Sequence, residues 1–185
     1  MILYIHGFAS SGQGVKARLF REYCKEKHIK FIAPSLSYIP ELAISTLQEL
    51  IESYDEKITL IGSSLGGYYA LYLAKKYSLN AVFINPSIYP YETLKKVEKY
   101  PANFYDGATF EWNEQHIESL KAYEVTDVNA VRALLLLQKG DETLDYKEAL
   151  NKLPNAEIIL EEGGNHSFEN IQRHFDRITA FASNY

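Results

Sequence analysis

Residues 58–69 read ITLIGSSLGGYY, and they are the most informative part of the chain about its fold. It places a G-x-S-x-G motif between a short apolar run and a segment with helical spacing. A strand, a tight turn and a helix in that order are the setting of a nucleophile elbow, which holds its central residue at the tip of a strained turn. The motif could also be an ordinary turn rich in glycine and serine, and Ser63 is a competing hydroxyl. Because Gly62 and Gly66 bracket Ser64 symmetrically, Ser64 is the candidate nucleophile.

The composition limits the class of protein. The chain has 185 residues, 46% of them hydrophobic, and a net charge of −5, which indicates one globular domain and disfavours nucleic acid or an anionic membrane as partner. No apolar stretch is long enough to span a bilayer, and the N-terminus lacks the basic region of a signal peptide. A single cysteine rules out an internal disulfide. We expect a cytoplasmic protein, either a monomer or a homodimer.

Candidate strands and helices alternate along most of the chain. Apolar runs predict strands over residues 2–5, 30–33, 58–61, 81–84, 133–138 and 156–160. Amphipathic spacing predicts helices over residues 15–27, 40–53, from the elbow to about 77, and 168–182. Such alternation is typical of an α/β fold with a mostly parallel sheet of about six strands and helices on both faces. Ligands bind such sheets at the carboxyl ends of the strands.

Residues 86–125 break this alternation. The segment contains no clean strand, and short helices are expected at 91–100 and 114–123. It can be interpreted as a satellite hydrophobic cluster, or as a small cap insertion that forms an acyl-binding wall over Ser64. We expect a single domain over residues 1–185 with this segment as the cap. It is rich in aromatic residues: Tyr89, Tyr91, Tyr100, Phe104, Tyr105, Phe110, Trp112 and Tyr123.

The loop after the first strand begins His6-Gly7-Phe8 and is rich in glycine and serine. By itself it is typical of an ordinary turn. In a protein with a nucleophile elbow, this loop supplies one backbone donor of the oxyanion hole, and the residue after the nucleophile supplies the other. The candidate donors are therefore the N–H groups of Phe8 and Leu65. We expect His6 to be a hydrogen-bonded histidine that fixes this loop with Gly7, because it lies at a strand end.

A carboxylate and a histidine follow the last two predicted strands. Asp141, Glu142 and Asp145 lie after the strand at 133–138, and Asp141 is favoured because it leaves the strand first. Glu142 is its main rival, whereas Asp145 reads as charge at a helix N-terminus. His166 lies in a glycine-rich loop at the end of the last strand. Ser64, Asp141 and His166 thus have the chain order of a nucleophile-elbow triad.

The remaining histidines and the cysteine are given structural or solvent-exposed roles. Cys24 lies on the apolar face of a predicted helix and is expected to be buried and unreactive. No set of histidines and carboxylates has the spacing of a metal site. We expect three histidines to be solvated: His28, His116 and His174.

Several motifs in order along the chain resemble those of the small bacterial α/β-hydrolases typified by the YqiA esterase. The resemblance implies an α/β-hydrolase fold without the first antiparallel strands of larger hydrolases. It implies Ser64 as nucleophile, Asp141 as acid and His166 as base, acting on acyl substrates as an esterase or thioesterase. The segment 86–125 matches least. The matching motifs are Tyr4-Ile5-His6-Gly7-Phe8, residues 62–70, Asn85-Pro86, residues 140–146 and residues 163–168.

These observations predict a serine hydrolase that works on a small-molecule acyl ester or thioester through an acyl-enzyme, with no metal or organic cofactor. An acyltransferase or amidase could use the same triad. A non-catalytic module that binds acyl ligands could also have retained the fold.

Overall fold

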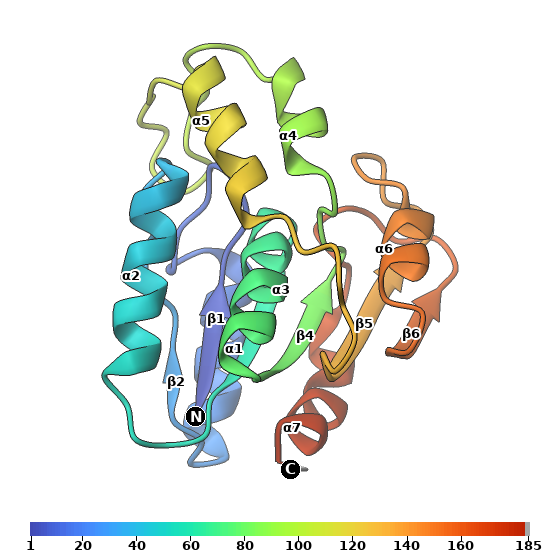
Figure 1. Ribbon diagram of the computed structural model, residues 1–185. Helices are drawn as coiled ribbons and strands as arrows, with labels where there is room; N and C mark the ends of the chain where they lie inside the picture. Colours follow the sequence, from blue (N-terminus) through green and yellow to red (C-terminus); the bar gives the residue numbers. More distant parts are fainter. Residues whose placement is uncertain (184–185) are drawn as a thin grey trace.

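The computed structural model describes residues 1–183 and contains a sheet of six parallel strands in the order β2-β1-β3-β4-β5-β6 (Figure 1). The expected α/β fold with a mostly parallel sheet is therefore confirmed. β2 forms one edge of the sheet beside β1, and it is shorter than the run predicted at 30–33. The strands are β1 (Ile2–Ile5), β2 (Phe31–Ile32), β3 (Thr59–Ser63), β4 (Asn80–Ile84), β5 (Ala133–Gln138) and β6 (Glu157–Glu161).

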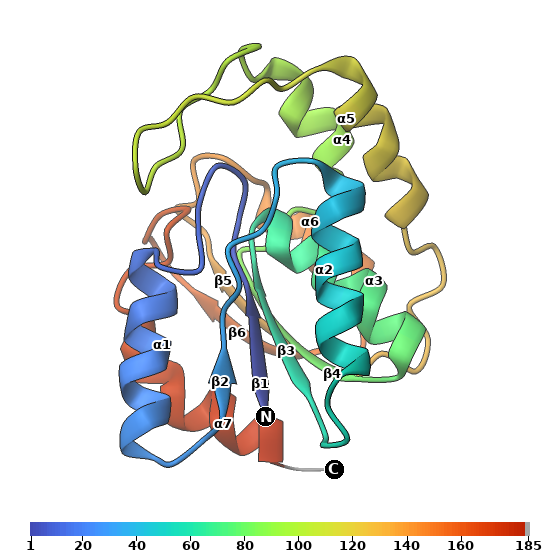
Figure 2. The ribbon, with the colours of Figure 1, turned by 90° about the vertical axis from the view of Figure 1, so that its left-hand side faces the viewer.

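Helices cover both faces of the sheet. Figure 2 shows α1 and α7 on one face, with α2 and α3 on the other. Within residues 1–183, 3-10 turns follow α4 and α5 and precede α7. The α-helices are α1 (Val15–Glu26), α2 (Pro40–Glu52), α3 (Leu65–Tyr77), α4 (Pro90–Thr93), α5 (Glu114–Leu120), α6 (Tyr146–Lys152) and α7 (Phe175–Ser183).

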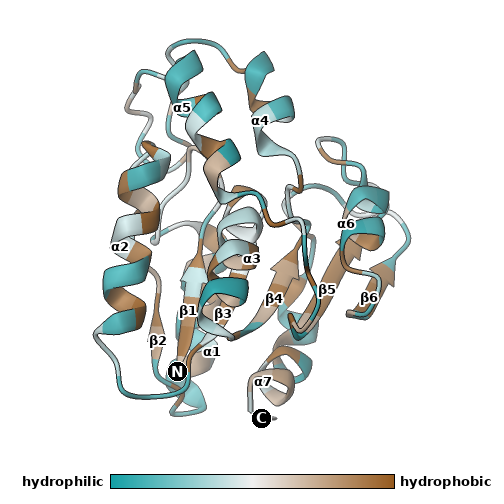
Figure 3. Ribbon diagram, in the orientation of Figure 1, coloured by the Kyte–Doolittle hydropathy of each residue, from teal (hydrophilic) through white to brown (hydrophobic). Residues whose placement is uncertain are grey.

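The sheet separates two hydrophobic cores. Alternate side chains of a strand point to opposite faces, so Leu3 and Ile5 pack with α2 and α3 whereas Ile2 and Tyr4 pack with α1 and α7. Buried apolar side chains lie on both faces of the central strands. Figure 3 shows β4 and β5 largely in brown, whereas the helices carry many teal residues. No helix within residues 1–183 combines the length and the apolar character needed to cross a membrane.

The segment 86–125 lies beyond the carboxyl ends of the strands (Figures 1 and 2). The short helix predicted at 114–123 is confirmed as α5 and the 3-10 turn Lys121–Tyr123. The helix predicted at 91–100 is wrong beyond Lys96, because Val97 is extended and Pro101 disfavours helical backbone at the residue before it. Between these two short helical segments, the β-structure is limited to one isolated antiparallel bridge that joins Ala102 and Thr109.

Two aromatic side chains of this segment, Phe110 and Trp112, attach it to the loop after β1. The ring of Phe8 lies 4.8 Å from that of Trp112 and 5.6 Å from that of Phe110. Trp112 is buried, and the Tyr68 hydroxyl donates to the Leu120 carbonyl at 2.7 Å, which fixes α5 on α3. The rings of Phe8, Phe110 and Trp112 therefore pack against the hydrophobic core on the α2 and α3 face of the sheet.

The helix predicted from residue 168 begins later. Phe168 and Asn170 have φ values of 60° and 55°, which a helix excludes, and the 3-10 turn Ile171–His174 precedes α7. Tertiary contacts explain the later start of the helix, because they hold residues 168 and 169 in place. The N–H of Glu169 donates to the Gln138 side chain at 2.8 Å, and the Phe168 side chain is buried.

Candidate active site

Ser64 occupies a strained turn between β3 and α3. Its backbone has φ 54° and ψ −123°, a conformation that costs a non-glycine residue free energy. Three backbone hydrogen bonds hold it there: the Ser64 N–H donates to the Ile84 carbonyl, and the Ser64 carbonyl accepts from the N–H groups of Gly67 and Ser87. Gly66 is required for the tight packing, since a Cβ there would lie 2.1 Å from the carbonyl oxygen of Ile5.

The structure brings Ser64, His166 and Asp141 into one hydrogen-bonded chain. Nε2 of His166 lies 3.0 Å from Oγ of Ser64, and Nδ1 of His166 lies 2.8 Å from Oδ2 of Asp141. The three residues follow β3, β5 and β6 and meet at the carboxyl edge of the sheet. The carboxyl group of Asp141 is almost fully buried, whereas 23% of the His166 side chain is exposed. This arrangement can take a proton from Ser64 and hold the resulting imidazolium.

Of the three candidate carboxylates, only Asp141 contacts the imidazole of His166. Glu142 accepts a hydrogen bond from the backbone N–H of His166 at 3.0 Å, and Asp145 is the N-cap of α6, where it accepts from the N–H of Lys147. The second oxygen of Asp141 accepts from the N–H groups of Thr143 and Leu144 at 2.9 and 2.8 Å. The three candidate carboxylates therefore have three different contacts.

The environment of Asp141 keeps it ionised at neutral pH. Burial acts to raise the pKa of this carboxyl. The hydrogen bonds from the His166 ring and from the N–H groups of Leu144 and Thr143 outweigh it, so the pKa of Asp141 lies below its usual value. Asp141 therefore fixes the imidazole with Nδ1 as donor and Nε2 facing Ser64.

The loop after β1 lies directly against Ser64. A Cβ at Gly7 would lie 3.1 Å from Cβ of Ser64, so the absence of a side chain brings this backbone close. Within residues 1–183, the N–H groups of Phe8 and Leu65 donate to no backbone or side-chain acceptor. The two expected oxyanion donors therefore have N–H groups with no acceptor among residues 1–183, and Leu65 directly follows Ser64.

His6 is buried and both of its ring nitrogens are engaged. Nε2 accepts from the Leu36 N–H at 2.9 Å, so the ring proton is assigned to Nδ1, which donates to the Gly7 carbonyl at 2.8 Å. Burial lowers the pKa of His6, which keeps the ring neutral. These contacts tie the loop after β1 to the loop after β2.

Two buried side chains for which the sequence predicted no role hold the His166 loop. Gln138, fully buried at the end of β5, accepts from the N–H groups of Asn165 and Glu169 and donates to the Glu161 carboxylate and the Glu169 carbonyl. Asn85, buried after β4, donates to the Asn165 and His166 carbonyls and accepts from the Gln138 N–H. The sequence signal was a glutamine that ends the otherwise apolar run ALLLLQ.

Two predictions about the other histidines are wrong. The ring of His174 is bonded to the Glu161 carboxylate at 2.8 Å, and only 15% of its side chain is exposed. His116 packs against the rings of Trp112 and Tyr38, and its buried Nδ1 has no partner within residues 1–183. His28 is exposed as expected.

Cys24 is fully buried, and burial raises the pKa of its thiol to about 11, which makes it unreactive.

Among residues 1–183, no group of three or more histidine, cysteine or acidic side chains could hold a metal ion.

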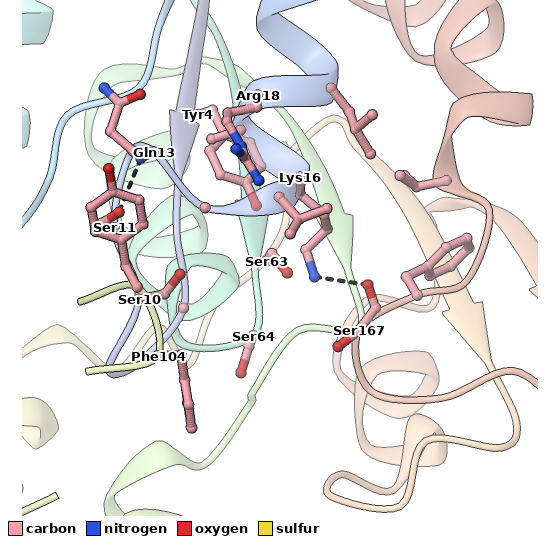
Figure 4. Close-up of a pocket in the computed structure, with 18 of the residues that line it drawn as sticks. Tyr4, Ser10, Ser11, Gln13, Lys16, Arg18, Ser63, Ser64, Phe104 and Ser167 are labelled. Atoms are coloured by element: carbon pink, nitrogen blue, oxygen red, sulfur yellow. Dashed lines mark hydrogen bonds between the residues drawn. The ribbon is translucent and has the colours of Figure 1, made fainter. Parts of the chain in front are cut away.

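A cavity of about 820 Å³ opens beside Ser64 and His166 (Figure 4). One wall comes from the start of α1, and another from Phe104 and Tyr105 at the tip of the segment 86–125. The N–H of Phe104 donates to the Ala9 carbonyl at 2.7 Å, which fixes this tip near the loop after β1. A volume of this size is typical of small-molecule sites.

Known proteins show the same fold at low sequence identity. Alpha/beta hydrolase domain-containing protein 10 from mouse superposes with a TM-score of 0.78 at 18% identity, covering 97% of this chain and 88% of that one. A monoacylglycerol lipase from Paleococcus ferrophilus gives a TM-score of 0.73 at 16% identity, covering 98% and 93%. The chain therefore has the α/β-hydrolase fold.

Similarity to bacterial sequences extends over the whole chain. "UPF0227 protein YcfP" from Salmonella gallinarum is 27% identical over 186 residues, which cover 98% of each chain. A family model, "Uncharacterised protein family (UPF0227)", matches residues 1–183. Together with the fold, these matches confirm the resemblance to small bacterial α/β-hydrolases of the YqiA type. The chain belongs to the UPF0227 family.

Proposed function

We propose that this protein is a serine hydrolase that cleaves carboxylic esters or acyl thioesters through Ser64, His166 and Asp141. The observation that carries the proposal is the continuous hydrogen-bonded chain from Ser64 Oγ through the imidazole to the buried Asp141 carboxylate, beside a large cavity. An unactivated serine hydroxyl is a weak nucleophile, and this arrangement of a base and a buried orienting acid is what activates it.

In the first half of the reaction, Ser64 Oγ attacks the acyl carbonyl while His166 Nε2 removes its proton. The carbonyl π electrons move onto oxygen, and the N–H groups of Phe8 and Leu65 hold this oxyanion, each donor being worth about 3–4 kcal/mol. When the intermediate collapses, the bond to the alcohol or thiol breaks and His166 returns the proton to the leaving group. An ester of Ser64 remains.

In the second half, water attacks this ester with His166 again as base, and Ser64 recovers its proton when the carboxylic acid leaves. Asp141 stays ionised throughout and stabilises the imidazolium in both halves. The strained backbone of Ser64 keeps its hydroxyl toward the cavity, so the turn does not reorganise during the reaction.

An acyl substrate is favoured by the cavity wall. Phe104 and Tyr105 are 85% and 56% exposed at the cavity, where they can contact an apolar acyl group, and a smaller pocket of about 60 Å³ lies between Leu65, Phe8 and Phe110. Two proteins with this fold fit such chemistry: the monoacylglycerol lipase from Paleococcus ferrophilus, and Est1E from Butyrivibrio proteoclasticus, which has been found with ferulic acid bound. We place the segment 86–125 as the cap over the site.

The test is a chain-length series of acyl esters and acyl thioesters with the wild type, Ser64→Ala and Ser63→Ala. We expect turnover by the wild type, a loss of roughly 10⁴-fold or more in Ser64→Ala, and activity close to wild type in Ser63→Ala, because Ser63 does not contact His166. Added acceptor alcohols or amines show whether the acyl group is transferred instead. No turnover of any substrate, together with measurable binding of acyl ligands, would identify a binding module and refute the proposal.

A further inference from the structure

The cavity beside Ser64 carries a charge opposite to that of the chain. The chain has a net charge of −5, yet the lining residues include Lys16, Arg18 and no aspartate or glutamate. Both cations come from the start of α1, which forms one wall of the cavity. A cavity lined by one sign of charge concentrates small ligands of the other sign.

Lys16 lies at the wall next to the His166 loop. Its ammonium donates to the carbonyl of Ser167 at 2.9 Å, as Figure 4 shows, and pairs with no carboxylate among residues 1–183. An ammonium has more donors than this one contact uses. Burial lowers the pKa of Lys16 to about 8, against an opposing attraction from Asp141. An anion beside Lys16 would offset the free energy that burying this charge costs.

Arg18 is the second cation and has no partner of its own. Within residues 1–183, its guanidinium makes no hydrogen bond and no ion pair, although it lines the same cavity. Figure 4 shows Arg18 and Lys16 extending from the start of α1, with Lys16 directed toward Ser167. The planar fork of a guanidinium matches the geometry of carboxylate and phosphate groups.

We propose that Lys16 and Arg18 form a subsite for an anionic group, a carboxylate or a phosphate, carried by the ester or thioester that Ser64 attacks. The inference rests on the proposed hydrolase function. The cavity is large enough for one molecule to reach both Ser64 and the two cations. With Phe104 and Tyr105 on another wall, the substrate combines an apolar part with an anion. That anion belongs either to the acyl part or to the leaving group.

Two pairs of probes separate these cases. p-Nitrophenyl butyrate and the mono-p-nitrophenyl ester of succinate share a leaving group and differ by a carboxylate on the acyl part. The butyryl thioesters of pantetheine and of 4′-phosphopantetheine share an acyl group and differ by a phosphate on the leaving group. We expect the wild type to have the higher kcat/KM for the anionic member of one pair. Lys16→Met and Arg18→Gln should each reduce that preference about tenfold.

Lys25→Met is the matched control, because it removes the same charge from an exposed position in the last turn of α1, outside the cavity. It should leave the preference unchanged. Lys16→Met could act through the Ser167 contact, which would lower kcat/KM equally for neutral and anionic probes. Arg18→Gln has no such contact, so an equal loss for both probes, or no loss, in this variant overturns the proposal.

The subsite and the hydrolase function fail differently. A wild type that hydrolyses neutral and anionic probes equally well overturns the subsite and leaves the hydrolase in place. Calorimetric binding of the two anionic probes to Ser64→Ala, compared with the Ser64→Ala/Arg18→Gln double variant, tests the subsite without turnover. Weaker binding by the double variant supports the subsite, and equal binding of both probes overturns it even if no ester is ever cleaved.

Discussion

Nε2 of His166 lies 3.0 Å from Oγ of Ser64, although 102 positions of sequence separate the two residues. In the sheet order, β4 and β5 lie between β3, which leads to Ser64, and β6, which leads to His166. The His166 loop therefore has to cross the ends of β5 and β4. Gly163 and Gly164, with φ values of 66° and 75°, let the chain turn back, and a Cβ at Gly164 would overlap the Gln138 side chain.

Gln138→Leu tests whether this crossing positions His166. The change leaves the N–H groups of Asn165 and Glu169 without their acceptor, so we expect the free energy of unfolding to fall by about 2–4 kcal/mol. The looser loop should lower kcat on p-nitrophenyl butyrate by at least about tenfold, with little change in KM. Urea denaturation and steady-state kinetics measure the two effects.

The control is Gln115→Leu, since Gln115 is exposed on α5 and outside the His166 loop. Gln115→Leu should change neither the free energy of unfolding nor kcat. A destabilised Gln138→Leu protein that keeps the wild-type kcat when folded would show that Gln138 supports stability alone.

Asp141→Asn tests the acid of the triad. The amide can no longer hold the imidazole in the required tautomer, so kcat should fall by about 10⁴-fold. Asp145→Asn, at the N-cap of α6, and Glu142→Gln, which retains an acceptor for the His166 N–H, should each keep activity within about tenfold. A larger loss in Glu142→Gln than in Asp141→Asn would reassign the acid.

The lowered pKa of Asp141 also predicts how stability depends on pH. A carboxyl whose pKa is lower in the folded than in the unfolded chain stabilises the fold above its unfolded pKa, and that contribution is lost as pH falls through the folded pKa. The difference in free energy of unfolding between wild type and Asp141→Asn should therefore be greatest near neutral pH and decline below about pH 4. Urea unfolding between about pH 3 and pH 7 measures it. A difference that grows with acidification would contradict the assigned environment.

The two kinds of aromatic residue in the segment 86–125 should respond differently to truncation. Trp112 is buried against Phe8, so Trp112→Ala should lower the free energy of unfolding by about 3–5 kcal/mol. Phe104 is 85% exposed at the cavity, so Phe104→Ala should change stability by less than about 0.5 kcal/mol while raising KM for acyl esters. Thermal unfolding and kinetics distinguish them. An unchanged KM in Phe104→Ala would remove this ring from the acyl wall.

The sequence predicted the features that depend on local pattern. The six strands were recognisable because apolar runs end in glycine- or proline-containing loops, and the structure confirms all six. Ser64, Asp141 and His166 stood out because each follows such a run, and parallel strands bring their carboxyl ends to one edge.

The features that the sequence did not predict depend on tertiary contacts. The spacing of apolar residues predicted a helix from residue 168, but the hydrogen bond between Glu169 and Gln138 holds the start of this segment in a non-helical conformation. His174 is hydrogen-bonded to Glu161, which lies on β6. His116 was expected to be solvated, but the rings of Trp112 and Tyr38 cover it. The sequence predicted no role for Lys16, and only the fold places it beside Ser167.

A fluorophosphonate probe, followed by peptide mapping with mass spectrometry, is the sharpest test of whether His166 activates Ser64. Such a probe reacts only with a serine whose hydroxyl is activated by a base, so it reports the Ser64–His166 pair rather than a substrate preference. We predict one adduct per chain, located on Ser64, retained in Ser63→Ala and absent from Ser64→Ala. An adduct on another residue, or folded protein that the probe does not label, would contradict the account.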